Sequence, residues 1–261
     1  MGSVKRLEET TQIVSNIKAA ENLYFIDVHS PQIAQALRPG QFIHMQIPGM
    51  PDKILRRPFS VYKTDAEAGT LCVLYQVVGA GTEHLSTLNA GERCSLIGPI
   101  GNAWAPPAGA RCLLVGGGVG AAPLFMLAQE LAQAAHGVHV VLGAQTKDAL
   151  VALADYEALP HTTLSAATDD GSFGYAGFCT QPAQDAIDSG EYDYVAVCGP
   201  EPLIKIVSGL AQDAGLPCEV SLERRMACGI GACLSCVVDT VEGKKRCCVD
   251  GPIFKASEVV W

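Results

Sequence analysis

The stretch Val115-Gly-Gly-Gly-Val-Gly-Ala-Ala-Pro-Leu124 lies between a short apolar run and the Ala- and Leu-rich segment Ala122–Ala135. The run predicts a buried strand and the segment predicts a helix, so the glycines occupy a strand-to-helix turn. Gly116, Gly118 and Ala121 follow the spacing G-x-G-x-x-G/A of turns that bind a dinucleotide pyrophosphate. The acidic residue expected about twenty residues further on is missing, so a tight turn without a ligand is the alternative.

Downstream of this turn, apolar runs typical of strands alternate with longer segments typical of helices. Such alternation predicts repeated βα units, and therefore a parallel sheet covered by helices on both faces. We expect strands at Val138–Leu142, Thr162–Ala167 and Tyr194–Cys198, and helices at Ala149–Leu159, Gln181–Ser189 and Leu203–Ala214.

Two loops follow strands of this predicted sheet, at the ends where parallel sheets bind ligands. One is Thr168–Ser172, and the other begins with Cys198-Gly199-Pro200. Glycine at position 199 permits the close approach of a nicotinamide. Cys198 can equally be an ordinary buried thiol, because reduced cysteine is among the most buried residue types.

Residues 1–100 carry a different pattern, in which short apolar or alternating runs are separated by turn-forming residues. Strands this short and this regularly spaced indicate a small closed antiparallel barrel rather than an open sheet. The Pro-, Ala- and Gly-rich segment Asn102–Ala110 separates this barrel from the βα units and is the expected domain boundary. The six predicted strands are Thr11–Ile17, Leu23–Val28, Phe42–Ile47, Phe59–Tyr62, Leu71–Val78 and Arg93–Ile97.

The motif Arg57-Pro58-Phe59-Ser60 leads into one of these strands. An arginine there can pair with a pyrophosphate and a serine hydroxyl can hydrogen-bond a flavin ring nitrogen, although an arginine beside a turn is commonly only solvated. Two further segments favour the flavin interpretation, namely Leu74-Tyr75-Gln76 and the Gly-rich turn Gly79–Leu85. The turn opens a predicted helix, whose free N–H groups suit a phosphate.

The last segment of the chain is rich in cysteine. Eleven of the 261 residues are cysteines, and Met1–Thr10 lacks the apolar core of a signal peptide. We therefore expect reduced thiols or metal ligands rather than a secreted disulfide scaffold. A short strand, Glu219–Leu222, leads into the loop Met226–Cys236, and a hairpin is expected at Val237–Cys248 with its turn at Glu242-Gly243.

Four cysteines have the C-x4-C-x2-C…C spacing of a plant-type [2Fe–2S] site: Cys228, Cys233, Cys236 and Cys248. Three thiolates from one tight loop can converge on a small inorganic core, and the intervening glycines let the backbone turn and aim N–H groups at the sulfurs. A structural zinc site is the alternative, although zinc knuckles usually come as separated C-x2-C pairs. Cys247, next to Cys248, leaves the identity of the fourth ligand open.

Composition excludes several other classes of protein. The chain is 49% hydrophobic and 17% charged with a formal net charge of −9, so it is neither disordered nor equipped to neutralise nucleic-acid phosphates. The longest uncharged run, Cys112–Gln129, contains several glycines and Pro123. It therefore indicates a strand, a turn and a helix rather than a membrane span.

Taken in chain order, four motifs resemble those of the ferredoxin–NADP reductase superfamily: R-P-F-S at 57–60, G-A-G-T at 79–82, G-G-G-V-G-A-A-P-L at 116–124 and C-G-P at 198–200. The cysteine-rich tail from Arg225, with C-V-D-G-P-I-F at 248–254, narrows this likeness. It resembles the electron-transfer subunits of two-subunit, NAD-dependent dihydroorotate dehydrogenases. The resemblance runs essentially from end to end.

The resemblance implies a β + α/β fold of three parts: an antiparallel β-barrel that binds FAD (1–101), a parallel-sheet domain that binds NAD (102–217) and a small [2Fe–2S] lobe (218–261). In that family the fourth cysteine ligand stands two residues before Asp-Gly-Pro, which selects Cys248 over Cys247. The residues implied to contact FAD are Arg57, Pro58, Phe59, Ser60, Leu74, Tyr75, Gln76, Gly81 and Thr82. Those expected at NAD are Gly116, Gly118, Cys198 and Gly199, and those at the cluster are Cys228, Cys233, Cys236 and Cys248.

The resemblance also implies an electron conduit in the cytoplasm. An FMN-containing partner subunit would oxidise dihydroorotate to orotate, and the cluster would pass the electrons on one at a time. FAD would collect two electrons and deliver them to NAD+ as a hydride. We expect two copies of each subunit, no nucleic acid and no membrane as partners, and no catalytic acid or base in this chain. The nearest alternative is a flavin and iron–sulfur subunit of a ferredoxin:NADP oxidoreductase or a sulfhydrogenase. A zinc-binding redox sensor with a dinucleotide domain is a distant one.

Overall fold

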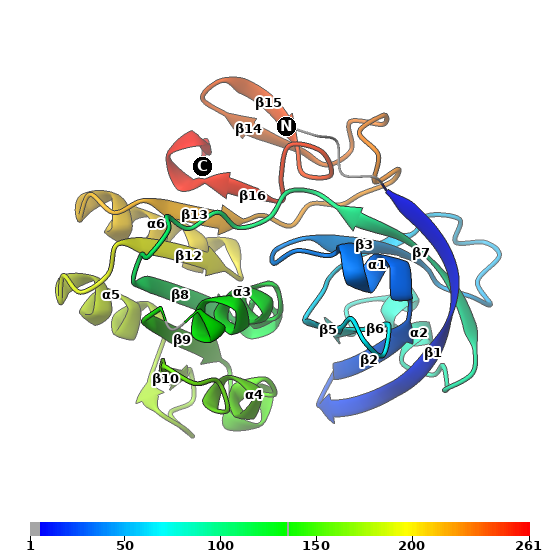
Figure 1. Cartoon of the computed structure of the whole chain (residues 1–261), viewed down its shortest axis with the longest axis horizontal. Helices are drawn as coiled ribbons and strands as arrows, with labels where there is room; N and C mark the ends of the chain where they lie inside the picture. Colours follow the sequence, from blue (N-terminus) through cyan, green and yellow to red (C-terminus); the bar gives the residue numbers. More distant parts are fainter. Residues whose placement is uncertain (1–5, 135) are drawn as a thin grey trace.

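The computed structural model describes residues 6–134 and 136–261. Two sheets stand side by side, and the cysteine-rich segment lies across one end of both (Figure 1). Strands β1 to β7 form the first sheet, β8 to β13 with β16 form the second, and β14 and β15 form a separate hairpin. The chain therefore has the three parts expected from its sequence.

The first sheet is antiparallel, with the strand order β4-β3-β7-β1-β2-β6-β5. Its strands are β1 (Leu7–Ala20), β2 (Leu23–His29), β3 (Phe42–Gln46), β4 (Arg57–Ser60), β5 (Lys63–Asp65), β6 (Thr70–Gln76) and β7 (Arg93–Ile100), with the short helices α1 (Pro31–Ala36) and α2 (Ala80–Leu85).

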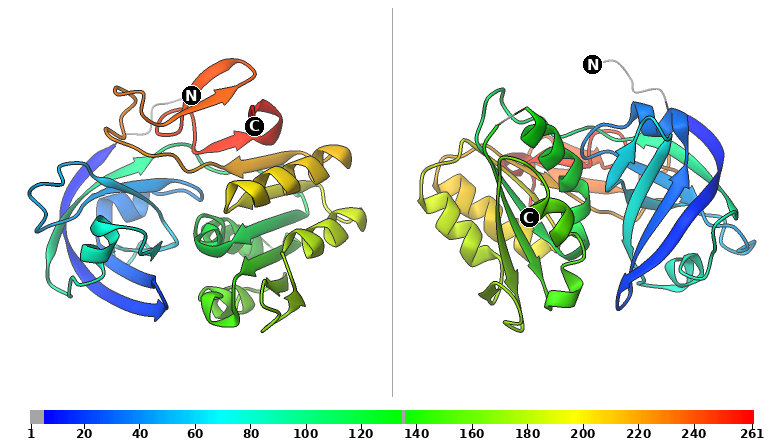
Figure 2. Two further views of the ribbon diagram at one scale, coloured as in Figure 1. Left: turned by 180° about the vertical axis from the view of Figure 1, so that it is seen from behind. Right: turned by 60° about the horizontal axis from the view of Figure 1, so that its bottom comes forward.

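This sheet is curved (Figure 2), and it encloses an apolar core. Ile13, Ile26, Val73 and Leu96 are almost completely buried inside it, because alternate residues of a strand face the same side. The predicted antiparallel strands are confirmed, but the predicted closure of the barrel is wrong, and the sheet is a half-barrel. Among the described residues its two end strands, β4 and β5, are not hydrogen-bonded to each other. One edge of the opening is therefore β4, which carries the R-P-F-S motif.

The second sheet has the order β11-β10-β9-β8-β12-β13-β16, and all its neighbours are parallel except the edge strand β16. Its strands are β8 (Cys112–Gly117), β9 (Val138–Ala144), β10 (Thr162–Thr168), β11 (Tyr175–Ala176), β12 (Tyr194–Cys198), β13 (Cys218–Ser221) and β16 (Ile253–Lys255). Its helices are α3 (Ala122–Gln133), α4 (Leu153–Glu157), α5 (Thr180–Asp188) and α6 (Glu201–Asp213).

Helices cover both faces of this sheet, as the βα pattern predicted. Leu114 of β8 packs in one core with Leu124 of α3, whereas its neighbour Val115 packs in the other with Ala183 of α5 and Val207 of α6. The expected helix 149–159 is shorter than predicted, because Leu150 has a ψ of 49° and breaks the helical backbone before α4.

The predicted end of the first long helix, Ala135, lies outside the described residues, and α3 ends at Gln133. In the parts of the chain that the structure describes, no helix has the length and hydropathy needed to cross a membrane.

Aromatic rings join the half-barrel to the α3 face of the parallel sheet. The ring of Tyr62 lies 4.6 Å from that of Phe125, which in turn meets Tyr156 edge-on at 5.0 Å. The hydroxyl of Tyr62 donates a 2.8 Å hydrogen bond to Asp155. Offset and edge-on aromatic pairs are favourable, so this contact holds the two sheets in a defined relation.

The cysteine-rich segment begins and ends in the parallel sheet. β13 lies beside β12, and Ser221 of β13 is paired with Ile253 of β16. Between them, β14 (Val237–Thr240) and β15 (Gly243–Arg246) form the expected hairpin. The hairpin ends earlier than predicted, so Cys247 and Cys248 lie in a turn rather than on a strand.

Candidate functional site

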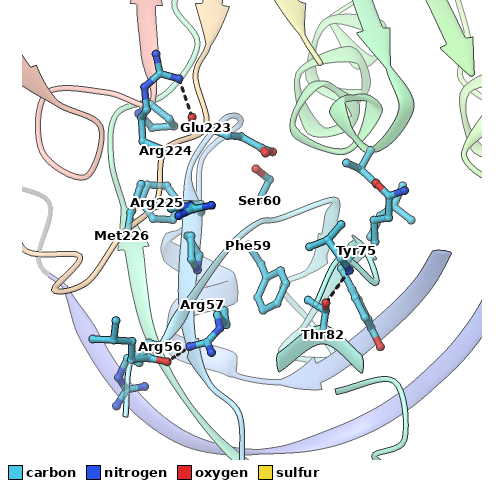
Figure 3. Close-up of a pocket in the computed structure, with 18 of the residues that line it drawn as sticks. Arg56, Arg57, Phe59, Ser60, Tyr75, Thr82, Glu223, Arg224, Arg225 and Met226 are labelled. Carbon is cyan, nitrogen blue, oxygen red and sulfur yellow. Dashed lines mark hydrogen bonds between the residues drawn. The ribbon is translucent and has the colours of Figure 1, made fainter. Parts of the chain in front are cut away.

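A cavity of about 1020 Å³ lies between the half-barrel and the segment that follows β13 (Figure 3). Its volume is at the upper end of the range for small-molecule sites. The walls come from the loop before β4, from β4 and β6, and from the residues that lead out of β13. The lining residues are Phe42, Asp52, Lys53, Ile54, Leu55, Arg56, Arg57, Pro58, Phe59, Ser60, Leu74, Tyr75, Gln76, Val78, Thr82, Val119, Ser221, Leu222, Glu223, Arg224, Arg225, Met226 and Pro252.

Eight of the nine residues predicted to contact FAD line this cavity, and the ninth, Gly81, lies against one of them. A Cβ atom at Gly81 would stand 3.0 Å from Nε of Arg57. Glycine at position 81 therefore leaves room for the arginine side chain at the edge of the cavity.

The apolar wall of the cavity is held rigidly. The Tyr75 ring stacks on Tyr24 at 5.5 Å and meets Phe59 edge-on at 6.0 Å. Its hydroxyl donates a 3.0 Å hydrogen bond to Asn16, and desolvation raises its pKa. Because the hydroxyl is already bonded within the barrel, Tyr75 offers the cavity no free proton donor.

The cavity is positively charged in a protein of net charge −9. Five lining side chains are cationic, and only Asp52 and Glu223 carry carboxylates. Figure 3 shows the carboxylate of Glu223 and the hydroxyl of Ser60 pointing toward each other. An anion such as a pyrophosphate suits this surplus, since arginine binds it bidentately. The cations are Lys53, Arg56, Arg57, Arg224 and Arg225.

The glycine-rich turn before α2 is closed by the side chain of Thr82. The N–H groups of Val78 and Gly79 donate to the hydroxyl of Thr82 at 2.9 and 3.3 Å, so these two groups are not free for a phosphate. The Thr82 hydroxyl in turn donates to the carbonyl of Gly79 at 3.0 Å. Thr82 closes the turn, and α2 spans only six residues.

The four residues predicted at NAD gather at the carboxyl ends of β8 and β12. Gly116 and Cys198 are register partners, Gly118 has a φ of +56° and Gly199 a φ of +151°. A Cβ atom at Gly120 would stand 2.5 Å from the carbonyl oxygen of Cys198. The turn therefore packs directly on the β12 loop. Desolvation raises the pKa of the buried Cys198 thiol, as expected if Cys198 is an ordinary buried thiol.

The four predicted cluster cysteines form two pairs. Sγ of Cys236 lies 3.4 Å from Sγ of Cys248, and the N–H of Cys233 donates to Sγ of Cys228 at 3.4 Å. Among the described residues, no three His, Cys, Asp or Glu side chains converge as ligands of one metal ion. Two thiol pairs match the two irons of a [2Fe–2S] centre held by four cysteines, so the donor set fits that group.

The loop around Cys228 favours a thiolate. Desolvation raises the pKa of Cys228, but N–H groups of Ile230 and Cys233 donate to its sulfur, each at 3.4 Å, and the net result is a pKa lowered to about 6. The thiolate is the form that binds iron. Gly229 and Gly231 provide the turns, with φ of +66° and +85°.

Cys247 is buried beside the pairs but belongs to neither. Its N–H donates to the carbonyl of Cys236 at 3.0 Å, and burial raises the pKa of its thiol to about 12. The contact between the Cys236 and Cys248 sulfurs favours Cys248 as the fourth ligand. Arg246 braces the turn by an ion pair with Asp250 at 3.2 Å.

His44 of β3 is a site residue that the sequence did not identify. It is completely buried, and neither ring nitrogen has a hydrogen-bond partner within the described residues. Burial lowers its pKa to about 4, and a contact with the Arg56 backbone, which lacks hydrogen-bond geometry, offsets only part of this shift, so the ring is neutral at pH 7. The ring lies against the cysteine loop, because a Cβ atom at Gly229 would stand 2.7 Å from Nδ1.

Other lining residues were missed because they carry no motif. Five of them form the run 52–56 before β4, and six form the run 221–226, between a strand and the cysteine loop. Its one signal in the sequence is the adjacent pair Arg224-Arg225 in an acidic chain.

Three family models match successive parts of the chain. The oxidoreductase FAD-binding domain matches residues 5–104, the oxidoreductase NAD-binding domain matches 114–209, and the iron–sulfur cluster binding domain of dihydroorotate dehydrogenase B matches 223–260. The three matches follow the order of the half-barrel, the parallel sheet and the cysteine-rich segment.

Curated relatives extend the likeness over nearly the whole chain. The dihydroorotate dehydrogenase B (NAD(+)) electron transfer subunit of Desulforamulus reducens is 37% identical, over 96% of this chain and 97% of its own. That of Geobacillus thermodenitrificans is 39% identical, over 97% and 98%. A solved structure of an NADH-dependent reduced ferredoxin-NADP oxidoreductase has a TM-score of 0.86 at 33% identity, over 97% of this chain and 90% of that chain.

Proposed function

The chain belongs to the family of dihydroorotate dehydrogenase B (NAD(+)) electron transfer subunits, and we propose on that premise that it accepts electrons from a partner that oxidises dihydroorotate and passes them to NAD+. The observation that supports this most is the continuity of its two sites. Met226 lines the cavity, and Cys228, the first cluster cysteine, follows two residues later. One short segment therefore joins the wall of the cavity to the cysteine loop.

In this proposal the cavity holds FAD. Arg57 pairs with the pyrophosphate, helped by the neighbouring cations, and the hydroxyl of Ser60 bonds the flavin ring. Phe59, Leu74 and Tyr75 offer an apolar surface that keeps water from one face of the ring. Bound FAD supplies the exchange between the two-electron chemistry of NAD and the single electrons of an iron–sulfur centre.

The cysteine loop holds a [2Fe–2S] cluster in the same proposal. Cys228 with Cys233, and Cys236 with Cys248, would each supply the two thiolates of one iron. The N–H groups that reach Cys228 stabilise negative charge on the sulfurs, and such bonds tune the potential of an iron–sulfur centre.

The carboxyl edge of β8 and β12 is where NAD would bind, through Gly116, Gly118, Cys198 and Gly199. Val119, in the same turn, also lines the cavity, so a nicotinamide at this edge would lie beside a flavin ring. We retain the domain limits 1–101, 102–217 and 218–261 as part of the proposal, although β13 and β16 hydrogen-bond within the parallel sheet.

The surface around the cysteine loop suits a protein partner. Ile230 is 53% exposed, Leu234 63% and Val249 38%, and the Cys233 side chain is also exposed. A cluster of exposed apolar side chains commonly marks an interface. We propose that an FMN-containing catalytic subunit binds here, in a cytoplasmic complex with two copies of each subunit.

Co-purification with the candidate catalytic subunit tests the proposal. The complex should contain FAD, iron and FMN and should reduce NAD+ with dihydroorotate, giving orotate. The 33% identical ferredoxin-NADP oxidoreductase structure favours ferredoxin reduction as the second candidate. Ferredoxin-dependent turnover without orotate formation would replace the first proposal by the second, and a colourless zinc protein would exclude both.

A further inference from the structure

His44 stands between the flavin cavity and the cysteine loop. On β3 it is the register partner of Pro58, within the R-P-F-S motif of β4. Its neighbour on the same side of the strand, Phe42, lines the cavity and packs in one apolar core with Cys236 and Cys248. Alternate residues of a strand share a face, so the His44 side chain points out of the barrel toward the cysteine-rich segment.

The His44 ring lies against Gly229. From the position of a Cβ atom at Gly229, Nδ1 is 2.7 Å away, Cε1 3.3 Å and Cγ 3.4 Å. The nitrogen edge of the ring therefore faces the loop at the residue directly after Cys228. Only a glycine at 229, with its φ of +66°, lets the ring come this close.

A buried imidazole without hydrogen-bond partners is costly. Burying a polar group without a hydrogen-bond partner destabilises the fold, and neither ring nitrogen of His44 has a partner with hydrogen-bond geometry within the described residues. A leucine or methionine would fill the same space without this cost. The placement is explained if the nitrogen gains its partner when the loop holds its cofactor.

We propose that Nδ1–H of His44 donates a hydrogen bond to a sulfur of the iron–sulfur centre, and thereby raises the centre's reduction potential. This inference rests on the proposed function, because it requires a cluster in the loop. A donor bonded to sulfur stabilises the extra negative charge of the reduced centre.

Two nearly isosteric variants test the hydrogen bond separately from packing. Asn at position 44 retains an N–H donor at the place of Nδ1, whereas Leu has the same shape and no donor. In the purified holoprotein we expect His44→Leu to weaken cluster reduction about ten-fold, a shift of about −59 mV for a one-electron couple. His44→Asn should stay close to the wild type. An EPR-monitored redox titration measures the potential, and the FAD potential should not change in either variant.

A measurement on unaltered protein covers the case in which a variant does not fold. In holoprotein labelled with 15N-histidine, pulsed EPR of the reduced centre should detect a 15N coupling, since the hydrogen bond transmits spin density to the ring. The coupling should be missing in labelled His44→Asn protein.

Three results overturn the inference: no 15N coupling in the wild type, an unchanged potential in His44→Leu protein with full iron content, or equal shifts in both variants. Wild-type protein that binds no iron contradicts the proposed function instead, so the two failures are distinguishable.

Discussion

The cavity and the cysteine loop adjoin each other but are built in opposite ways. The cavity takes its walls from β4, β6 and the segment 221–226, which meet only because two sheets pack together. The loop takes three of its four thiols from residues 228–236, and its shape follows from glycine turns and N–H bonds to one sulfur. The cavity therefore depends on tertiary packing and the loop on local backbone geometry, so damage to one should largely spare the other.

The largest expected effect is confined to the cysteine loop. Cys233→Ser should remove the cluster and lower dihydroorotate-dependent NAD+ reduction by more than about 100-fold, because a hydroxyl is a poor replacement for a thiolate ligand. FAD should remain bound. Iron content, the visible spectrum and coupled turnover check this.

Cys218→Ser is the matched control, since Cys218 is partly buried outside the loop. Full iron content and full activity in the Cys233→Ser protein would contradict the assignment of Cys233 as a cluster ligand.

Alanine substitutions at two glycines separate the effect of backbone strain from that of the contact with His44. Gly229 and Gly215 have nearly the same φ, +66° and +69°, but only Gly229 has a neighbour within 4 Å of an added Cβ. Both alanine variants should lose about 1 kcal/mol of folding free energy. Gly229→Ala should in addition lose most of its iron, because the methyl group would displace His44 or the loop. Equal iron contents in the two variants would contradict the close contact.

The third prediction addresses the cavity alone. Arg57→Ala should weaken FAD binding about 10- to 100-fold, the usual effect of losing a charge-assisted hydrogen bond worth about 1.5–3 kcal/mol. Iron content should stay unchanged. Fluorescence titration of the apoprotein measures FAD binding. Arg111→Ala is the control, because Arg111 pairs with Asp193 far along the chain from the cavity residues; the same loss of affinity there would count against a specific role for Arg57.

The smallest effect should leave both regions untouched. His139 of β9 bonds Tyr192 and Ser165, each at 2.8 Å, and desolvation lowers its pKa. The unfolded chain then binds a proton more readily, so stability falls as the pH drops below about 6.5. His139→Gln should flatten this pH dependence by about 1 kcal/mol or less, as read from urea unfolding at pH 7.5 and 5.5. A parallel loss of FAD or iron would show that the regions are coupled through the sheet.

The same contrast explains what could be predicted from the sequence. The βα alternation and the short strands predicted the correct sheets, because periodicity reports burial directly. The cysteine spacing identified the loop because its geometry is local. Arg224 and Met226 were missed as cavity residues, since their position depends on where β13 sits beside β12. His44 was missed because a lone histidine in an apolar strand has no periodic or spacing signal.

Two expectations failed at chain turns. The break at Leu150 comes from a single backbone angle, which an Ala- and Leu-rich segment does not reveal. The early end of the hairpin at Arg246 is stabilised by its ion pair with Asp250, a contact between residues whose pairing the strand pattern does not indicate.

The register partnership of Ser221 with Ile253 has a consequence for how such proteins can diversify. The segment between these residues leaves the sheet and returns to it at one point of its edge, so it is an insertion whose two ends are fixed side by side. Its length and surface can change at little entropic cost once its two ends are held together. Only Leu222–Met226 and Pro252 also serve the cavity. Replacing the rest of the segment while preserving those few positions could redirect the protein to another electron donor and leave the cavity intact.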